Sequence, residues 1–269
     1  MPVAVVYGLS ALAALVPAWL YVMRGGGRVP LFWALLVVAL AGPVSWAAVQ
    51  LAGRWQTGFS TSLWVTIAVS IVIFAAIAAV NRAAWRLTPL LLPYLLLLGA
   101  LAMIWQNAPG RPLSGTAAGS WLVAHIVVSE LTYALITLAA IAGLAILLQE
   151  RALKDKRPTT LSRRLPAVAD AERLQVGLLV AGEAVLGAGL VTGFITLHSA
   201  SGTVLQLDHK MVLAIVAFVV IGTLLGLHFL AGMRGRRAAR LILIAYLIIT
   251  LAYPGVKFVT DVLVGGSPS

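Results

Sequence analysis

The chain of 269 residues contains no cysteine, and only 10% of its residues are charged. The absence of cysteine excludes disulfides, thiolate metal sites and dithiol redox chemistry. The scarcity of charge excludes an ordinary soluble domain, because a soluble protein of this size needs a polar surface around its core. Hydrophobic residues make up 61% of the chain, and the mean hydropathy is +1.03. Most of the surface must therefore be solvated by lipid.

Eight apolar segments divide the chain, each close to the ~20 residues that a helix needs to cross a bilayer. They lie at about 3–23, 31–51, 63–80, 88–105, 118–148, 174–197, 211–231 and 241–262. The sequence predicts an all-α fold, a polytopic transmembrane bundle of about eight helices. We expect one transmembrane domain over residues 1–262 and a short tail at 263–269. The fifth helix is expected to continue beyond the membrane through Gln149 and Glu150.

Positive charge is concentrated in alternate loops. The loops after the first, third, fifth and seventh segments hold 15 of the 19 Lys and Arg residues. The opposite loops hold Arg54, Arg111, Lys210 and Lys257. By the positive-inside rule the first set is cytoplasmic, so both termini are expected outside. The net charge of +11 therefore marks membrane topology, and the expected partner is the lipid bilayer and not a nucleic acid.

The longest loop runs from about Glu150 to Arg173 and is rich in basic residues. This composition favours a solvated linker attracted to lipid headgroups, with a site for a protein partner as the alternative. Two glycine pairs, Gly189-x-x-x-Gly193 and Gly222-x-x-x-Gly226, are typical of helices that approach closely in membranes.

Two carboxyls fall inside apolar segments, Glu130 in the fifth and Glu183 in the sixth. Each lies about nine residues in from opposite faces, which places both at about 13 Å depth. Such a pair can form a proton or cation site. The alternative is that each is a protonated carboxyl bonded to a hydroxyl or carbonyl of an adjacent helix.

The histidines gather at one face of the predicted bundle. His125, His198 and His209 lie near the outer face, whereas His228 lies about 25 Å deep, near the cytoplasmic face. Neutral imidazole is the usual protein ligand of haem iron and of many transition metals. A histidine in a loop is more often solvated, and one in an apolar helix needs a polar partner. The sequence shows no motif of a self-contained catalyst, and whether the chain is an enzyme stays open.

Three stretches resemble the cytochrome c assembly protein family, which includes CcsA, CcmC and the HemX and YpjD branches. The first is Trp121-Leu-Val-Ala-His125 with its continuation to Tyr133, which is similar to the family's histidine-bearing helix. The second is Leu227-His228 followed by Gly232-Met-Arg-Gly-Arg-Arg-Ala238, with Met233 where the family has Trp. The third is the outer loop, where Gly202, Asp208 and Lys210 keep the register. The resemblance covers about residues 60–262.

The outer loop departs from the haem-handling branch of the family, where it carries several tryptophans. Ser201, Leu205, Leu207 and Leu213 stand at the tryptophan positions, and His209 stands at a Pro position. The family's second external histidine has no match. The sequence is therefore most similar to the YpjD-like branch, whose location would be the bacterial inner membrane.

The resemblance implies haem as a cofactor and cytochrome complex assembly as the process. His125 matches an external haem ligand and His228 an internal one. A second outer ligand follows from position and not from the resemblance: His209 stands beside Asp208, its expected hydrogen-bond acceptor, and the alternatives are His198 or an open sixth position. Among the external cations, Lys210 is the best placed by motif to pair with a propionate. A haem-binding or haem-handling protein is thus the leading interpretation. The alternatives are a non-haem transporter or transporter accessory subunit that uses Glu130 and Glu183, and a structural partner of another membrane protein.

Overall fold

Apolar segments in lipid fold as helices, because the bilayer leaves every backbone N–H and C=O to be paired within the chain. A computed structural model describes residues 3–52, 58–108, 120–201, 209–233, 235–255, 258, 259 and 262. The regular structure of these residues is helical. Its elements are α1 (Val3–Met23), α2 (Pro30–Leu51), α3 (Phe59–Val80), η1 (Ala84–Leu87), α4 (Thr88–Ile104), α5 (Ser120–Lys154), α6 (Thr160–Arg164), α7 (Val168–Ser201), α8 (His209–Ala231), α9 (Gly235–Thr250) and η2 (Leu251–Gly255).

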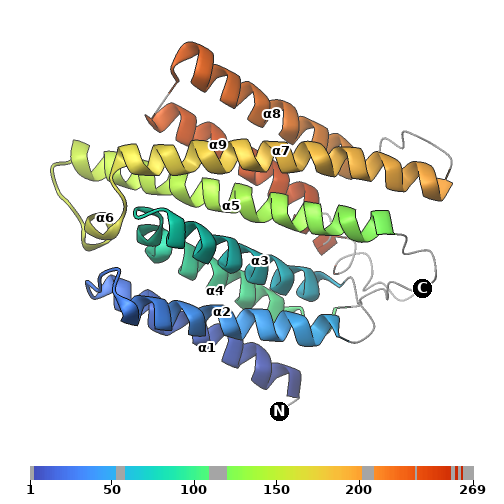
Figure 1. The fold of residues 1–269 in the computed structure, drawn as a ribbon, viewed down its shortest axis with the longest axis horizontal. Helices are drawn as coiled ribbons and strands as arrows, with labels where there is room; N and C mark the ends of the chain where they lie inside the picture. The colour runs from blue at the N-terminus through green and yellow to red at the C-terminus, as the bar shows by residue number, and fades with distance from the viewer. Residues whose placement is uncertain are drawn as a thin grey trace.

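The long helices lie side by side along the long axis of the molecule (Figure 1). Within the described residues, seven stretches are long and apolar enough to cross a membrane: Val3–Met23, Pro30–Leu51, Phe59–Val80, Ala84–Ile104, Trp121–Lys154, Val168–Ile195 and Met211–Ala231. Helix α9 is shorter, but the π-helical segment η2 continues it to Gly255. The predicted polytopic helical bundle is confirmed, and the chain is a multi-pass membrane protein.

Several helices are longer than their apolar segments. Helix α5 continues to Lys154, which confirms the predicted extension, and α7 begins at Val168, six residues before the predicted span. Hydropathy detects only the part of a helix that lipid surrounds. The first turns of α7 contain Ala169, Ala171 and Glu172, which are good helix formers and extend the helix into water.

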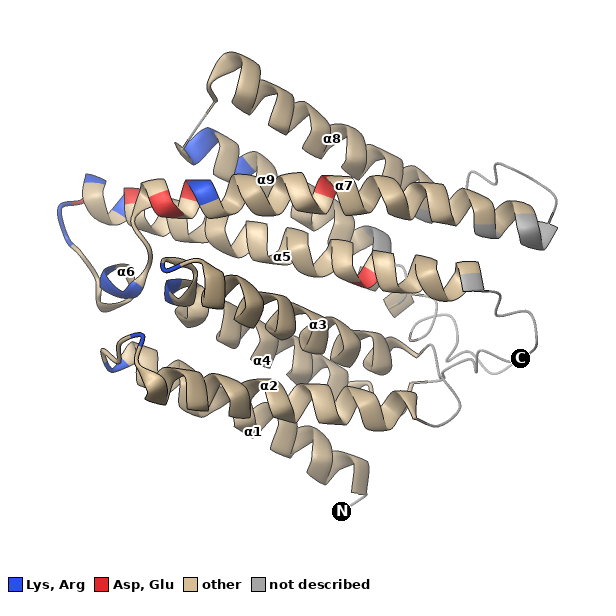
Figure 2. Cartoon of the chain, in the orientation of Figure 1, with Lys and Arg blue, Asp and Glu red and all other residues tan. Residues whose placement is uncertain are grey.

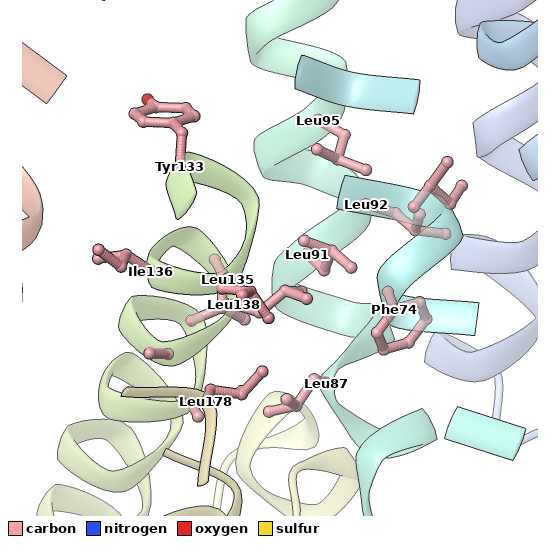
Figure 3. Packing of buried hydrophobic residues seen from close by; sticks show 14 of the residues in the cluster. Phe74, Leu87, Leu91, Leu92, Leu95, Tyr133, Leu135, Ile136, Leu138 and Leu178 are labelled. Atoms are coloured by element: carbon pink, nitrogen blue, oxygen red, sulfur yellow. The ribbon is translucent and has the colours of Figure 1, made fainter. Parts of the chain in front are cut away.

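Helix α5 lies at the centre of the bundle. It packs against α3, α4, α7 and α9. Of the residues in its most apolar stretch, 78% are buried, compared with 17% for the corresponding stretch of the peripheral α8. Figure 3 shows Leu135 and Leu138 of α5 in the same cluster of buried side chains as Leu91 of α4 and Phe74 of α3. This position lets side chains of α5 reach four neighbouring helices.

The loop between α5 and α7 is exposed over residues 153–160, as its composition predicts for a solvated linker, and packs on the bundle after them. It contains α6, whose first turn is capped by Thr159, and α6 packs against α1 and α5. The Gln149 side-chain nitrogen donates hydrogen bonds to the carbonyls of Ser162 at 2.9 Å and Pro166 at 3.0 Å. The loop is therefore docked on the bundle. Figure 2 shows that Lys and Arg gather at this same end of the molecule.

Candidate functional site

His125 lies in the second turn of α5, and its ring is half-buried against α7. A Cβ atom on Gly193 would lie 3.1 Å from His125 Cε1, so the ring occupies the space that a side chain at this position would fill. Gly189 and Gly193 were predicted to let helices approach closely. In the structure, α7 packs closely along α5, and Gly193 makes room for the imidazole between them.

Hydrogen bonds determine the tautomer of the His125 ring. Nδ1 lies 3.1 Å from the carbonyl oxygen of Gly189 and 3.3 Å from Thr192 Oγ1. A carbonyl oxygen only accepts, so Nδ1 carries the hydrogen and donates it to Gly189. In the neutral ring, Nε2 then keeps its lone pair. Metal-binding histidines are usually held in this way, with one ring N–H donated to a backbone carbonyl.

His228 has the same arrangement at the other end of the bundle. It lies in the last turn of α8, and its Nδ1 donates to the carbonyl oxygen of Met233 at 3.0 Å. Beside it, the backbone N–H of Gly235 donates to Glu172 Oε1 at 2.7 Å. The first bond closes the turn after α8, and the second joins the first residue of α9 to α7. His228 Nε2 likewise keeps a lone pair in the neutral ring.

The remaining residues of the predicted outer site are only partly described. His198 is exposed in the last turn of α7. His209 and Lys210 belong to the first turn of α8, but their side chains, and all of Asp208, lie outside the described part of the chain. Within that part, no group of three His, Asp or Glu residues is placed to hold a metal ion.

The two intramembrane carboxyls contact different helices. Glu130 is buried, and its Oε2 accepts a hydrogen bond from Thr66 Oγ1 of α3 at 2.9 Å. Glu183 is half-buried beside α8, with Oε1 3.0 Å from where a Cβ on Gly222 would lie. Its Oε2 is buried and has no hydrogen-bond partner among the described residues. The two carboxyls therefore lie at separate positions: Glu130 faces α3, and Glu183 faces α8.

Three tyrosines meet in the core, and they are not among the site residues predicted from the sequence. The hydroxyl of Tyr246 in α9 contacts that of Tyr94 in α4 and lies 3.2 Å from that of Tyr133 in α5. Thr137 and Thr250 each lie 3.4 Å from a phenol oxygen of this group. Tyrosine in membrane proteins is enriched at the interfaces. Their position inside apolar segments and away from the segment ends was the signal that could have revealed them.

An aromatic cluster lies at the end of the bundle where α3 begins and α4 ends. The ring of Phe258 packs edge-to-face on Phe59, with centroids 5.5 Å apart, and on Trp105, with centroids 5.1 Å apart. Helix α5 begins at this same end (Figure 1), so His125 and the aromatic cluster belong to one end of the molecule. The far end carries the basic residues (Figure 2).

Comparison with known proteins agrees with the motifs in the sequence. The family model described as cytochrome C assembly protein matches residues 30–264. An uncharacterised 28.8 kDa protein of Azospirillum brasilense is 56% identical over 97% of this chain and 98% of its own length. The inner membrane protein YpjD of Escherichia coli strain K12 is 29% identical over 71% of this chain and 70% of its own. The cytochrome c biogenesis protein CcsA of Parasynechococcus marenigrum is 24% identical over 56% of this chain and 57% of its own.

Proposed function

Because the chain belongs to the cytochrome c assembly protein family, we propose that it binds haem at the outer end of the bundle, with His125 as an axial ligand. The observation that carries the proposal is the hydrogen bond from His125 Nδ1 to the Gly189 carbonyl. This bond fixes the ring and leaves Nε2 to bind iron. The bound haem would supply a redox-active iron that can be held for, or passed to, a partner protein.

The residues present suit a haem better than a bare metal ion. A porphyrin provides four nitrogen ligands, so the protein needs to add only one or two. His209 is the proposed second ligand, with Asp208 as the acceptor for its ring N–H and Lys210 as the partner of a propionate. His198 is the alternative second ligand, because it ends α7 on the same side. The half-buried rings of Trp105 and Phe258 lie at the same end of the bundle and are the proposed apolar contacts of the haem, in place of the loop tryptophans that this chain lacks.

His228 is the basis of a rival inner site. It has the same hydrogen-bonded ring geometry as His125, but it lies at the basic end of the bundle. The two histidines belong to opposite ends of the bundle, so they cannot bind the same iron. An inner haem would be a separate site, and the variants below distinguish the two.

The test is a haem titration of purified protein, followed by absorption spectroscopy. The wild type is expected to give a saturable haem spectrum. His125→Ala is expected to lose most of the binding, and His209→Ala is expected to change the spectrum from two axial histidines to one. His198→Ala removes an exposed histidine from the same end of the bundle and tests the alternative second ligand; it should leave the spectrum unchanged if His209 is the ligand.

Each result decides between the sites. Loss of the spectrum with His228→Ala but not with His125→Ala would move the haem to the inner end. A change from two axial histidines to one with His198→Ala, and not with His209→Ala, would identify His198 as the second ligand in place of His209. A wild-type protein that takes up no haem would overturn the proposal.

A transporter, or an accessory subunit of one, is the second candidate function. It is favoured by buried polar groups that a structural bundle does not need: Glu130 with Thr66, and the buried Oε2 of Glu183. Intramembrane carboxyls commonly mark ion or proton pathways. Ion uptake by proteoliposomes that depends on Glu130 or Glu183 and needs no haem would favour this candidate.

The proposed location is the inner membrane of a bacterium. One relative is named an inner membrane protein, and the relatives reported above are bacterial. Haem and other membrane proteins are the proposed partners beside the lipid.

A further inference from the structure

A hollow runs along the outward face of α1 and ends at the turn that joins α1 to α2. Its wall along the helix is apolar, formed by Ala13, Val16, Pro17 and Leu20, and at the turn it is lined by Tyr21 and Arg24 with the glycines that follow. Pro17 and Ala13 are exposed. The hollow therefore changes from apolar to cationic along its length.

A second arginine reaches the same turn from a distant part of the chain. The guanidinium of Arg164, in α6, lies 2.7 Å from where a Cβ on Gly25 would be. Gly25 has φ of 98°, in the left-handed region that favours glycine, and the missing side chain leaves room for Arg164. The docked loop thus brings Arg164 beside the residue that follows Arg24.

The two arginines have no acidic partner in the described structure. The ion pairs found there are Arg151 with Asp155 and Arg173 with Asp170. The Nε atom of Arg164 is buried and has no hydrogen-bond partner among the described residues. The dipole at the C-terminus of α1 accounts for one cation near this turn. It does not account for a second cation brought there by another segment, because like charges repel.

We propose that this hollow binds one anionic phospholipid. Its phosphate would lie between Arg24 and Arg164, since guanidinium groups bind phosphate through charge-assisted hydrogen bonds. One acyl chain would follow the apolar wall toward Ala13. A soluble anion would leave that wall unused, and a neutral lipid would leave the two charges unpaired. The site lies at the basic end of the bundle, where the cytoplasmic leaflet presents anionic headgroups. The inference does not depend on haem binding.

The test measures binding of phosphatidylglycerol to the delipidated full-length chain by native mass spectrometry, with phosphatidylcholine as the neutral lipid. We expect the wild type to bind phosphatidylglycerol more tightly than phosphatidylcholine. The double substitution Arg24→Gln with Arg164→Gln is expected to weaken phosphatidylglycerol binding by about tenfold or more, as expected for the loss of charged hydrogen bonds.

Arg163→Gln is the matched control. Arg163 neighbours Arg164 in the same helix, but it is exposed and donates to the carbonyl of Pro158. It should bind phosphatidylglycerol like the wild type. Ala13→Phe is a second variant that fills the apolar wall and leaves both arginines in place. It should weaken lipid binding without changing the charge.

Four results would overturn the proposal. The first is unchanged phosphatidylglycerol binding by the double variant, and the second is equal binding of both lipids by the wild type. The third is a loss of binding with Arg163→Gln as large as that of the double variant. The fourth is full phosphatidylglycerol binding by Ala13→Phe together with displacement of the lipid by inorganic phosphate. The last result would assign the arginines to a soluble anion. Size-exclusion chromatography of each variant ensures that a loss of binding is not a loss of fold.

Discussion

The Thr66 hydroxyl of α3 donates a hydrogen bond to the Glu130 carboxyl of α5 across 2.9 Å in the core of the bundle. Thr66 is 1% exposed and Glu130 is 4% exposed, so water does not replace this bond when it is lost. A buried polar group without a partner is costly in an apolar environment. The pair therefore contributes both to stability and to the position of the carboxyl.

Thr66→Val removes the hydroxyl and keeps the shape of the side chain. We expect it to lower the free energy of unfolding by about 0.5–2 kcal/mol, the range of hydrogen bonds between membrane helices. Thr66→Ser keeps the donor and should recover part of the loss. The measurement is unfolding of the purified protein by a denaturing detergent. A valine variant as stable as the wild type would show that Thr66 is dispensable.

Tyr246→Phe tests the phenol cluster. The change keeps the ring and removes the hydroxyl that contacts Tyr94, Tyr133 and Thr137. We expect a loss of about 1–2 kcal/mol, because several buried hydroxyls lose a partner at once. Tyr7→Phe is the control, since Tyr7 is exposed and its ring stacks on Trp46. Equal thermal stability of the two variants would contradict the prediction.

Gly193→Val tests the space that holds His125. Its side chain would meet the imidazole, whose Cε1 already lies 3.1 Å from the Cβ position. We expect haem binding to weaken by about tenfold, the lower end of the effect of disturbing a group that orients a metal ligand. Gly226→Val is the matched control, because its Cβ would meet nothing within 4 Å. If Gly193→Val leaves the haem spectrum and the affinity for haem unchanged, His125 is not the haem ligand.

Reporter fusions test the orientation of the bundle. A fusion at Pro158 should report the cytoplasm, and one at Ser269 should report the outer side, because 15 of the 19 basic residues mark the inner side. A C-terminus found in the cytoplasm would require an odd number of spans and would reverse the assignment of the outer end.

The sequence predicted those features that depend only on the order of residues along the chain. Apolar length located seven of the eight predicted spans, with ends that differ by up to six residues, and the basic loops identified one end of the bundle. Side-chain partners were not accessible in this way, because they join residues as distant as Tyr94 and Tyr246. The docking of α6 was also missed, since a basic loop has the composition of a solvated linker whether or not Gln149 binds its carbonyls. His125 was identified through a motif, but its contact with Gly193 required the packing of α5 on α7.

The length of α5 has a mechanical consequence. Its 35 residues, at 1.5 Å per residue, give a rod of about 50 Å, well beyond the ~30 Å hydrocarbon layer. His125 lies near one end of this rod, and Gln149, which holds the docked loop, lies near the other. A tilt of α5 as a rigid rod would therefore move both ends at once, and it would have to shift the contacts that α5 makes with α3, α4, α7 and α9.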